Sequence, residues 1–208
     1  MTDALMRAEP LEDGIGFVEL IDTLGTDLTV VNAARVSFAN RSYELSERDK
    51  KLIHRMMRLH HGSPFEHVVF QFRVRAPLHV VHQWQRHRIG SYNEESGRWV
   101  QMRGDFFNPG GPHEQVYRLH FESAYATYLW LLDHGESKEN ARLVLPESLY
   151  KEFIWTVNGR SVLNFIGLRA DLEAQGHIRA YAIAIEEMLT SFIPTVLDSF
   201  YNHGRRQP

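Results

Sequence analysis

The chain has 208 residues with 43% hydrophobic and 12% aromatic content, which is typical of one folded domain with a sizeable core and predicts a single domain over residues 1–208. A net charge of -3 argues against a surface that holds nucleic acid, and no apolar run approaches the roughly 20 residues of a membrane span, so we expect a soluble, cytoplasmic protein with neither nucleic acid nor membrane as a partner. The absence of cysteine excludes disulfides, zinc–cysteine sites and thiolate nucleophiles together, so any covalent catalysis must use another group.

The first part of the chain contains two strand patterns and three helix patterns. Residues 16–22 read as a strand, and residues 28–38 as a short helix whose apolar end, Val36 to Phe38, should turn inward. Ser46 opens the next helix in capping-box style, and its apolar face extends to about His61. Strict alternation of apolar and polar residues predicts a half-buried strand at 68–76, after which Pro77 starts another helix.

The second part is mainly helical. The predicted elements are a long helix at 114–134, a helix capped by Ser137 that reaches Leu145, a strand at 149–157, and helices at 161–169, 174–192 and from Pro194 onward. Strands and helices do not alternate strictly. This order favours an α+β fold, with a mostly antiparallel sheet flanked by helices.

The run from Arg86 to Arg98 contains three arginines, a histidine and several short polar side chains, with scarcely an apolar residue to bury. Because guanidinium groups match phosphate oxygens in a planar fork, the run indicates a phosphorylated small-molecule ligand; a solvated loop held by ion pairs is the plain alternative. On one helix, Arg86 and Arg88 would point roughly 200° apart. Either the helix ends before them, or they serve different ligands.

Two other interpretations use different chemistry. A metal hydrolase would draw on the histidines, although the chain has no His-Glu-x-x-His pattern; its candidate ligands are His60, His61, His67, His79 and His82. A non-catalytic nucleotide- or RNA-binding module would use charged and aromatic side chains, namely Arg86, Arg88, Tyr92, Arg98 and Trp99. Ser96 is an alternative nucleophile, but a serine needs an activating base, and His87 need not face it.

The spacing Arg86-His87-Arg88, seven residues, then Ser96 resembles the signature of the flavin-dependent thymidylate synthases. Three further segments resemble the same family in the same order: Ser63 to His67, Ala141 to Pro146, and Trp155 to Ser161 with its continuation through Asn164 to Asp171. The resemblance covers the chain from about Gly16 to Tyr201.

That resemblance implies a methyltransferase that converts dUMP to dTMP for nucleotide biosynthesis. Methylenetetrahydrofolate would donate the carbon, FAD would transfer the hydride and NADPH would be the reductant, with tetrahydrofolate as the product. It also implies the fold of this family and a homotetramer whose active sites are shared between protomers. The absence of cysteine agrees with this resemblance, because the other, unrelated class of thymidylate synthases attacks the pyrimidine with a cysteine thiolate and this chain could not use that mechanism.

The resemblance also implies the roles of individual residues, with no metal. The residues expected to contact FAD are Ser63, Arg86, His87, Arg88, Glu94, Asn158, Gly159, Arg160 and Asn164. Those expected to contact the nucleotide are Gln83, Trp84, Gln85, Arg86, Glu94, Glu95, Ser96, Gly97, Arg98, Arg142 and Arg169. Arg169 would be catalytic: a fixed positive charge against the uracil edge would favour the anionic ring. Trp99 and Glu173 depart from the residues usual in the family, and this leaves the folate contacts open.

Overall fold

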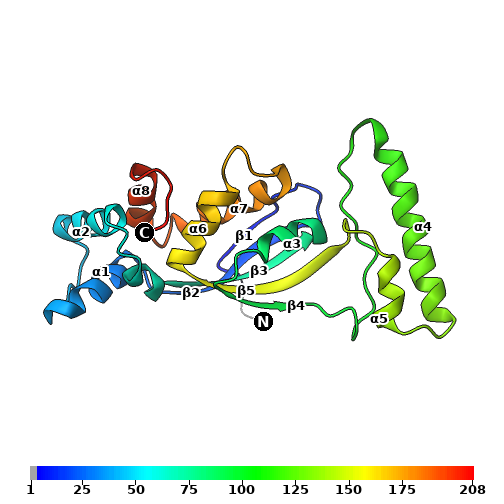
Figure 1. Ribbon diagram of the computed structural model, residues 1–208, viewed down its shortest axis with the longest axis horizontal. Helices are drawn as coiled ribbons and strands as arrows, with labels where there is room; N and C mark the ends of the chain where they lie inside the picture. The colour runs from blue at the N-terminus through cyan, green and yellow to red at the C-terminus, as the bar shows by residue number, and fades with distance from the viewer. Residues whose placement is uncertain (1–3) are drawn as a thin grey trace.

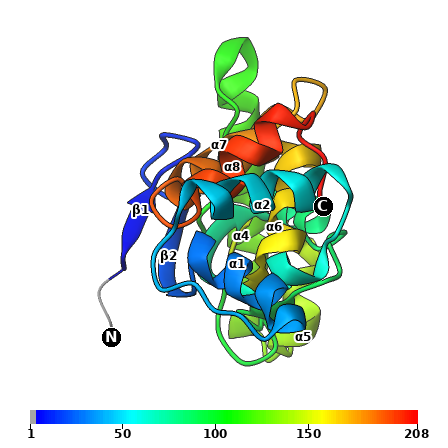
Figure 2. The same cartoon turned by 90° about the vertical axis from the view of Figure 1, so that its left-hand side faces the viewer.

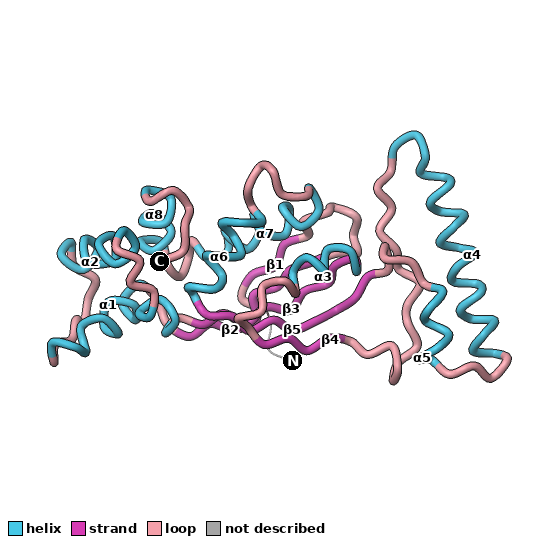
Figure 3. Tube along the Cα trace, viewed as in Figure 1, coloured by secondary structure: helices cyan, strands magenta, loops and turns pink. Residues whose placement is uncertain are grey.

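The computed structural model describes residues 4–208, and its secondary structure is drawn in Figures 1 and 3. The strands are β1 (Met6–Ala8), β2 (Phe17–Leu24), β3 (Val69–Pro77), β4 (Ser91–Glu94) and β5 (Tyr150–Asn158). The helices are α1 (Asp27–Arg35), α2 (Glu47–Arg58), α3 (Leu78–Trp84), α4 (Glu114–Asp133), α5 (Lys138–Ala141), α6 (Gly159–Arg169), α7 (Gly176–Leu189) and α8 (Pro194–Asn202).

The five strands form one sheet in the order β1-β2-β3-β5-β4, and every neighbouring pair is antiparallel. β3 is the middle strand, and its alternating pattern turns Phe70, Phe72 and Val74 into the core with no exposed surface. Its other face carries polar side chains, and there the Arg73 guanidinium pairs with Glu152 at 2.7 Å and with Glu19 at 3.3 Å. The expected α+β fold with an antiparallel sheet is therefore confirmed.

Helices α3, α6 and α7 lie on one face of this sheet, and α1, α2 and α8 gather at one end of the molecule (Figures 1 and 2). Trp84, at the end of α3, is fully buried between the two layers and packs edge-on against Phe153 and Trp155. At the opposite end, α4 and α5 form an arm around a small second core of Met102, Tyr128, Ala141 and Leu149. No helix within residues 4–208 is long and apolar enough to span a membrane.

Three sequence expectations need correction. Val36 and Phe38 do not turn inward: they are 74% and 82% exposed, because the chain tightens after Arg35 into the 3-10 helix Val36–Phe38, whose C-cap, Ala39, has a φ of 50°. The helix expected to reach Leu145 is the short α5 followed by a 3-10 turn. Two strands were not predicted: β1, near the start of the chain, and β4, which lies inside the arginine run.

A buried carboxylate holds α8 in place. Asp27, 4% exposed at the start of α1, accepts hydrogen bonds from the backbone N–H groups of Thr195 (2.8 Å) and Val196 (3.0 Å). Because Asp27→Ala would leave these donors unpaired, we expect it to lower the free energy of unfolding by about 1–2 kcal/mol, and Asp27→Asn, whose amide oxygen can replace only one of the two acceptor oxygens, should recover at most part of this loss. Urea denaturation followed by circular dichroism measures this; equal stability of Asp27→Ala and wild type would show that the cap contributes nothing.

Candidate active site

The arginine run begins where α3 stops. Val80, Val81 and Trp84 bury the inner face of α3, and the helix ends at Trp84 with Gln85 as its C-cap. The backbone N–H of His87 then closes a turn on the Trp84 carbonyl at 3.0 Å. Arg86 and Arg88 therefore lie beyond the helix, and helical geometry does not fix the angle between their side chains. Of the two alternatives that the sequence left open, the helix ending before these arginines is the one observed.

Tyr92 ties the run to the sheet. Its strand, β4, pairs with β5 from Ser91↔Thr156 to Glu94↔Phe153, and its ring stacks on Trp155 with centroids 6.2 Å apart. Burial raises the pKa of the Tyr92 phenol, so the hydroxyl stays protonated and donates to the His87 carbonyl at 2.8 Å. The polar residues on either side of Tyr92 are thus presented from a rigid support.

A cavity of about 320 Å³ opens where the arginine run meets α6. Three guanidinium groups line it, and its lining contains no carboxylate; the residues are Arg86, His87, Arg88, Ile89, Ser161, Asn164, Leu168, Arg169 and Gln207. Four residues expected to contact FAD (Arg86, His87, Arg88 and Asn164) and the expected catalytic Arg169 therefore surround one space. Its chemistry suits an anionic ligand with several oxygen acceptors.

Arg169 is held by two contacts with the segment at the end of α3. Its Nε donates to His87 Nε2 at 3.1 Å, and its Nη2 donates to the Gln83 carbonyl at 3.3 Å. Since His87 Nε2 accepts, the imidazole proton lies on Nδ1 and the ring is neutral. Burial, and secondarily the charge of Arg86, lower the pKa of Arg169, but a guanidinium still keeps its proton. Arg169 therefore brings a fixed positive charge to the cavity.

His87 should make stability sensitive to acid. Burial, followed by the charge of Arg169, lowers its pKa from 6.5 to about 4. A depressed pKa in the folded state contributes stability that is fully present above pH 6.5 and is lost as the pH falls from 6.5 toward 4. We therefore expect the unfolding free energy of His87→Gln to fall less steeply than that of wild type over this window.

Urea denaturation at several pH values measures this slope. His120→Gln, at an exposed position on α4, is the matched control and should keep the wild-type slope. A His87→Gln profile that superimposes on wild type would show that His87 does not titrate as proposed.

A second cavity, of about 300 Å³, lies beside β4 and the 3-10 turn after α5. Its polar lining is Glu94, Arg142 and Lys151, surrounded by leucines and Met102. Lys151 is only 5% exposed; its Nζ donates to the Glu95 carbonyl and lies 3.2 Å from a Glu94 carboxylate oxygen. The other Glu94 oxygen accepts from Gln85 Nε2 at 3.1 Å. Glu94 is therefore fixed from two sides.

Gly97 allows the chain to pass close to Arg142. A Cβ at this position would lie 3.0 Å from Arg142 Cδ and 3.1 Å from Met102 Sδ, so these side chains would have to move by a few tenths of an ångström to admit it. Beside it, Arg98 pairs with Glu139 at 3.2 Å, and the Ser96 carbonyl accepts from the Trp99 backbone N–H at 3.0 Å. The absence of a side chain at Gly97 is what lets the Ser96–Arg98 turn and Arg142 come together.

A third group of expected site residues, beside the two that line the cavities, surrounds the N-terminus of α6. Asn158 caps this helix, with its Oδ1 accepting from the Ser161 N–H at 2.9 Å, so its amide N–H₂ stays available to a ligand. A Cβ on Gly159 would lie 2.7 Å from the Phe65 carbonyl, which explains the glycine. Arg160 pairs with Glu66 at 2.8 Å and thereby joins α6 to the segment that carries the exposed Ser63.

Most of the expected site residues therefore fall into three groups, and the side chains of Gln83, Trp84 and Glu95 lie outside them. The Trp84 side chain is fully buried and packs in the core, so the contact expected between Trp84 and the nucleotide stays a prediction for its backbone. Gln83 pairs with Gln175, and Glu95 lies 3.8 Å from Arg103.

Three polar residues outside the expected set also line these cavities: Ser161, Gln207 and Lys151. For Lys151, the sequence contains a pattern from which a partnered, buried lysine could have been predicted. The two-residue strand period places it on the same face of β5 as the buried Phe153 and Trp155, where a lysine is out of place without a partner. For Gln207 the sequence contains no such pattern, because only the path of the C-terminal segment brings it to the cavity.

The histidines considered as metal ligands are spread out. Within residues 4–208 no group of three or more histidine, aspartate or glutamate side chains is arranged to hold a metal ion. His79 instead pairs with His177, with Nε2 and Nδ1 3.0 Å apart. Exposed His61 and the 75% exposed Trp99 lie at the surface, where either could contact a ligand ring.

Comparison with known protein families gives a match over most of the chain. A profile described as thymidylate synthase complementing protein matches residues 19–195. The flavin-dependent thymidylate synthase of Thermotoga neapolitana is 44% identical over 200 residues, covering 91% of this chain and 92% of the relative. The protein of the same name from Thermus thermophilus is 39% identical over 207 residues, covering 90% of this chain and 76% of the relative.

Solved structures give the same result for the fold. A UMP/dUMP methylase, PolB from Streptomyces cacaoi, determined with bound 5-Br dUMP, superimposes with a TM-score of 0.84 at 35% identity. The match covers 92% of this chain and 97% of that one. The structure of PolB with 5-Br UMP gives a TM-score of 0.83.

Proposed function

Because the chain belongs to the thymidylate synthase complementing protein family, we propose that it is a flavin-dependent thymidylate synthase that methylates dUMP to dTMP. Methylenetetrahydrofolate is the carbon donor, FAD the hydride carrier and NADPH the reductant in this proposal, with tetrahydrofolate as product. The single observation that carries it is the cavity in which Arg86, Arg88 and Arg169 converge without a carboxylate. Support for the nucleotide comes from PolB, a relative determined with 5-Br dUMP.

The donor set fits a flavin dinucleotide. A diphosphate needs several fixed cations and N–H donors, and the lining supplies three guanidinium groups and the Asn164 amide. The chain lacks a Gly-x-Gly-x-x-Gly turn, so side chains must take the place of a glycine-rich phosphate loop. Arg86, His87, Arg88 and Asn164 would hold the group here, while Ser63, Asn158, Gly159 and Arg160 would hold it at the start of α6. Bound FAD would supply the two-electron chemistry.

Arg169 is the catalytic residue in this proposal. Its contacts with His87 and the Gln83 carbonyl use Nε and Nη2 and leave Nη1 to face a ligand. Against the uracil N3 and carbonyl edge, this charge would stabilise the anionic ring and raise electron density at C5. Because the chain has no cysteine, the ring must be activated by such surroundings and not by thiolate addition.

In the second cavity, we propose that the nucleotide is contacted by Glu94 and Arg142 and by the neighbouring residues Ser96, Gly97 and Arg98. Figure 1 shows α5, which leads into Arg142, well separated along the long axis from α6, which carries Arg169. The proposal includes a homotetramer in which each active site combines residues of neighbouring protomers. The separation of these two helices along the long axis agrees with a shared site. The single domain over residues 1–208 and the cytoplasmic location stay predictions.

The absorption spectrum of the purified protein tests the flavin. We expect bands in the blue and near-ultraviolet that survive desalting or return when FAD is added. A combined Arg86→Ala/Arg88→Ala variant should lose them, because it removes two of the three cations that line the cavity. Arg118→Ala, an exposed arginine on α4, is the control and should retain them. A protein that stays colourless with excess FAD would contradict the proposal.

A further inference from the structure

Helix α2 carries a line of cations that the proposed reaction does not use. Arg48, Lys51, Arg55 and Arg58, here called the basic stripe, are all exposed and lie at positions i, i+3, i+7 and i+10. This spacing keeps them along one side of the helix, over a length of about 15 Å at the usual rise per residue. In a chain with a net charge of -3, such a row is a local excess of positive charge.

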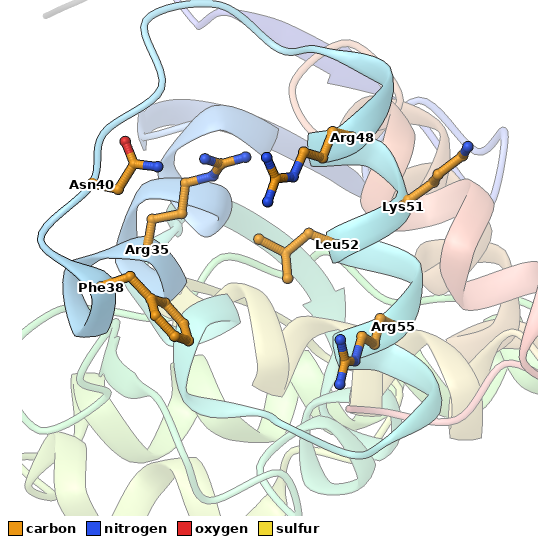
Figure 4. Close-up of a pocket in the computed structure, with 7 residues that line it drawn as sticks. All are labelled: Arg35, Phe38, Asn40, Arg48, Lys51, Leu52 and Arg55. Carbon is orange, nitrogen blue, oxygen red and sulfur yellow. The ribbon is translucent and has the colours of Figure 1, made fainter.

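The stripe borders the cavity drawn in Figure 4, which measures about 450 Å³. Arg48 and Arg55 reach from α2 over it, Lys51 lies toward its outer side, and Phe38, 82% exposed, forms the opposite wall. Arg35 also lines it but is already paired with Asp49 at 2.5 Å. The cavity lining contains no carboxylate.

The four cations of the stripe are not paired with any carboxylate of the part of the chain that the structure describes. Within residues 4–208 no carboxylate lies within 4.0 Å of their nitrogen atoms, whereas the neighbouring Lys50 pairs with Glu47 at 2.7 Å. Favourable interaction with the helix dipole accounts for cations in the last turn, where Arg55 and Arg58 lie, but not for Arg48 and Lys51 nearer the N-terminus. The row is therefore available to an anion from outside the chain.

The stripe leads toward the proposed active site. α2 ends at Arg58, and the next residues are Leu59, His60 and His61, followed by Ser63 of the proposed FAD site. The His60 ring lies 3.3 Å from the carbonyl of Gln207, a residue that lines the arginine cavity. The stripe and the cavity with Arg169 are thus connected through one short segment.

We propose that the basic stripe binds a linear chain of carboxylates, the poly-γ-glutamyl tail of the folate co-substrate. A single phosphate requires donors that converge, but these cations are arrayed in a line, which matches charges repeated along an extended chain. The exposed Phe38 offers an apolar wall for the methylene groups between those carboxylates. This inference rests on the proposed function, because it takes folate as the co-substrate.

The test compares KM for monoglutamyl and pentaglutamyl methylenetetrahydrofolate. We expect the wild-type KM to be about tenfold lower for the pentaglutamyl form, as several exposed ion pairs add up, with the ratio shrinking as salt is raised. In Arg48→Gln/Arg55→Gln the ratio should fall below about twofold. The control Lys50→Gln/Arg118→Gln removes the same charge from α2 and α4 outside the stripe and should keep the wild-type ratio.

Binding of the penta-γ-glutamate peptide, measured by calorimetry, separates failure of this inference from failure of the proposed function. We expect the peptide to bind wild type and the control, and to bind Arg48→Gln/Arg55→Gln at least fivefold more weakly. Two results would overturn the inference. One is an equal KM for the two folates in wild type, and the other is displacement of the peptide by ADP at a lower concentration than by free penta-γ-glutamate. If neither folate yields thymidylate, the proposed function fails, and the peptide titration still decides whether the stripe binds carboxylates.

Discussion

Arg169→Ala is expected to lower the rate of thymidylate formation by about 10²–10³-fold or more, because it removes a fixed charge from the proposed reacting edge of the pyrimidine. The side chain is oriented by His87 Nε2 at 3.1 Å and by the Gln83 carbonyl at 3.3 Å, so the charge is positioned before any ligand arrives. Arg169→Lys should recover little. A lysine keeps the charge but cannot make both contacts and also present a planar donor pair to the ring.

Steady-state turnover with saturating dUMP measures the effect. Flavin content and the circular dichroism spectrum should stay close to wild type, because Arg169 lies at the end of α6 and outside the buried core. Arg118→Ala serves as the control for the loss of an exposed arginine and should turn over normally. If Arg169→Ala retains near-normal turnover with bound flavin, the electrostatic role assigned to it is wrong.

Lys151→Met should have the largest effect on stability, about 1–3 kcal/mol of unfolding free energy, because the buried amine loses its hydrogen bonds while the Glu94 side chain, 32% exposed, stays partly solvated. The lysine is 5% exposed and contacts both the Glu94 carboxylate and the Glu95 carbonyl, so its removal leaves a partly buried negative charge and a carbonyl without their donor. Methionine preserves the apolar stem of the side chain. The loss therefore reports on the contacts and not on a cavity.

Urea denaturation of the single and double variants measures this coupling. Adding Glu94→Gln to Lys151→Met should recover part of the lost stability, because the charge that had become unpaired is then absent. Strictly additive losses in the double-mutant cycle would show that Lys151 and Glu94 do not interact as the structure indicates.

Most of the sheet could be predicted because its strands are half-buried and alternate. β3 carries a clear period of two, and β5 is rich in aromatic and β-branched residues; Phe72 and Val74 lie beside Trp155 and Phe153 on the same face of the sheet. β4 could not be predicted. Its four residues, Ser-Tyr-Asn-Glu, have no such pattern, and the strand forms because it pairs with β5 and Tyr92 stacks on Trp155.

The error at Val36 and Phe38 has a related cause. Both residues continue the apolar sequence of α1, but the turn there is a 3-10 helix, in which side chains advance by a third of a circle and no longer follow the α-helical face. Sequence patterns report local periodicity, whereas the end of α1 depends on the path that the chain takes from α1 to α2.

Site prediction from the sequence depended on the motifs. The resemblance placed Arg86, His87, Arg88 and Asn164 in the expected set, and the structure brings their side chains around one cavity with Arg169. It could not show that Trp84, inside the same motif, points into the core, since that follows from the packing of α3 against β5. Nor could it supply Lys151, whose role depends on the pairing of β4 with β5.

The most direct test of the proposed chemistry follows the redox state of the flavin without oxygen. Photochemically reduced flavin bound to the protein should be reoxidised only when dUMP and methylenetetrahydrofolate are both present, with tetrahydrofolate as the folate product and with no inhibition by thiol-alkylating reagents, because the chain has no cysteine. Dihydrofolate formed in equal amount to thymidylate, or turnover by flavin-free protein, would contradict the account.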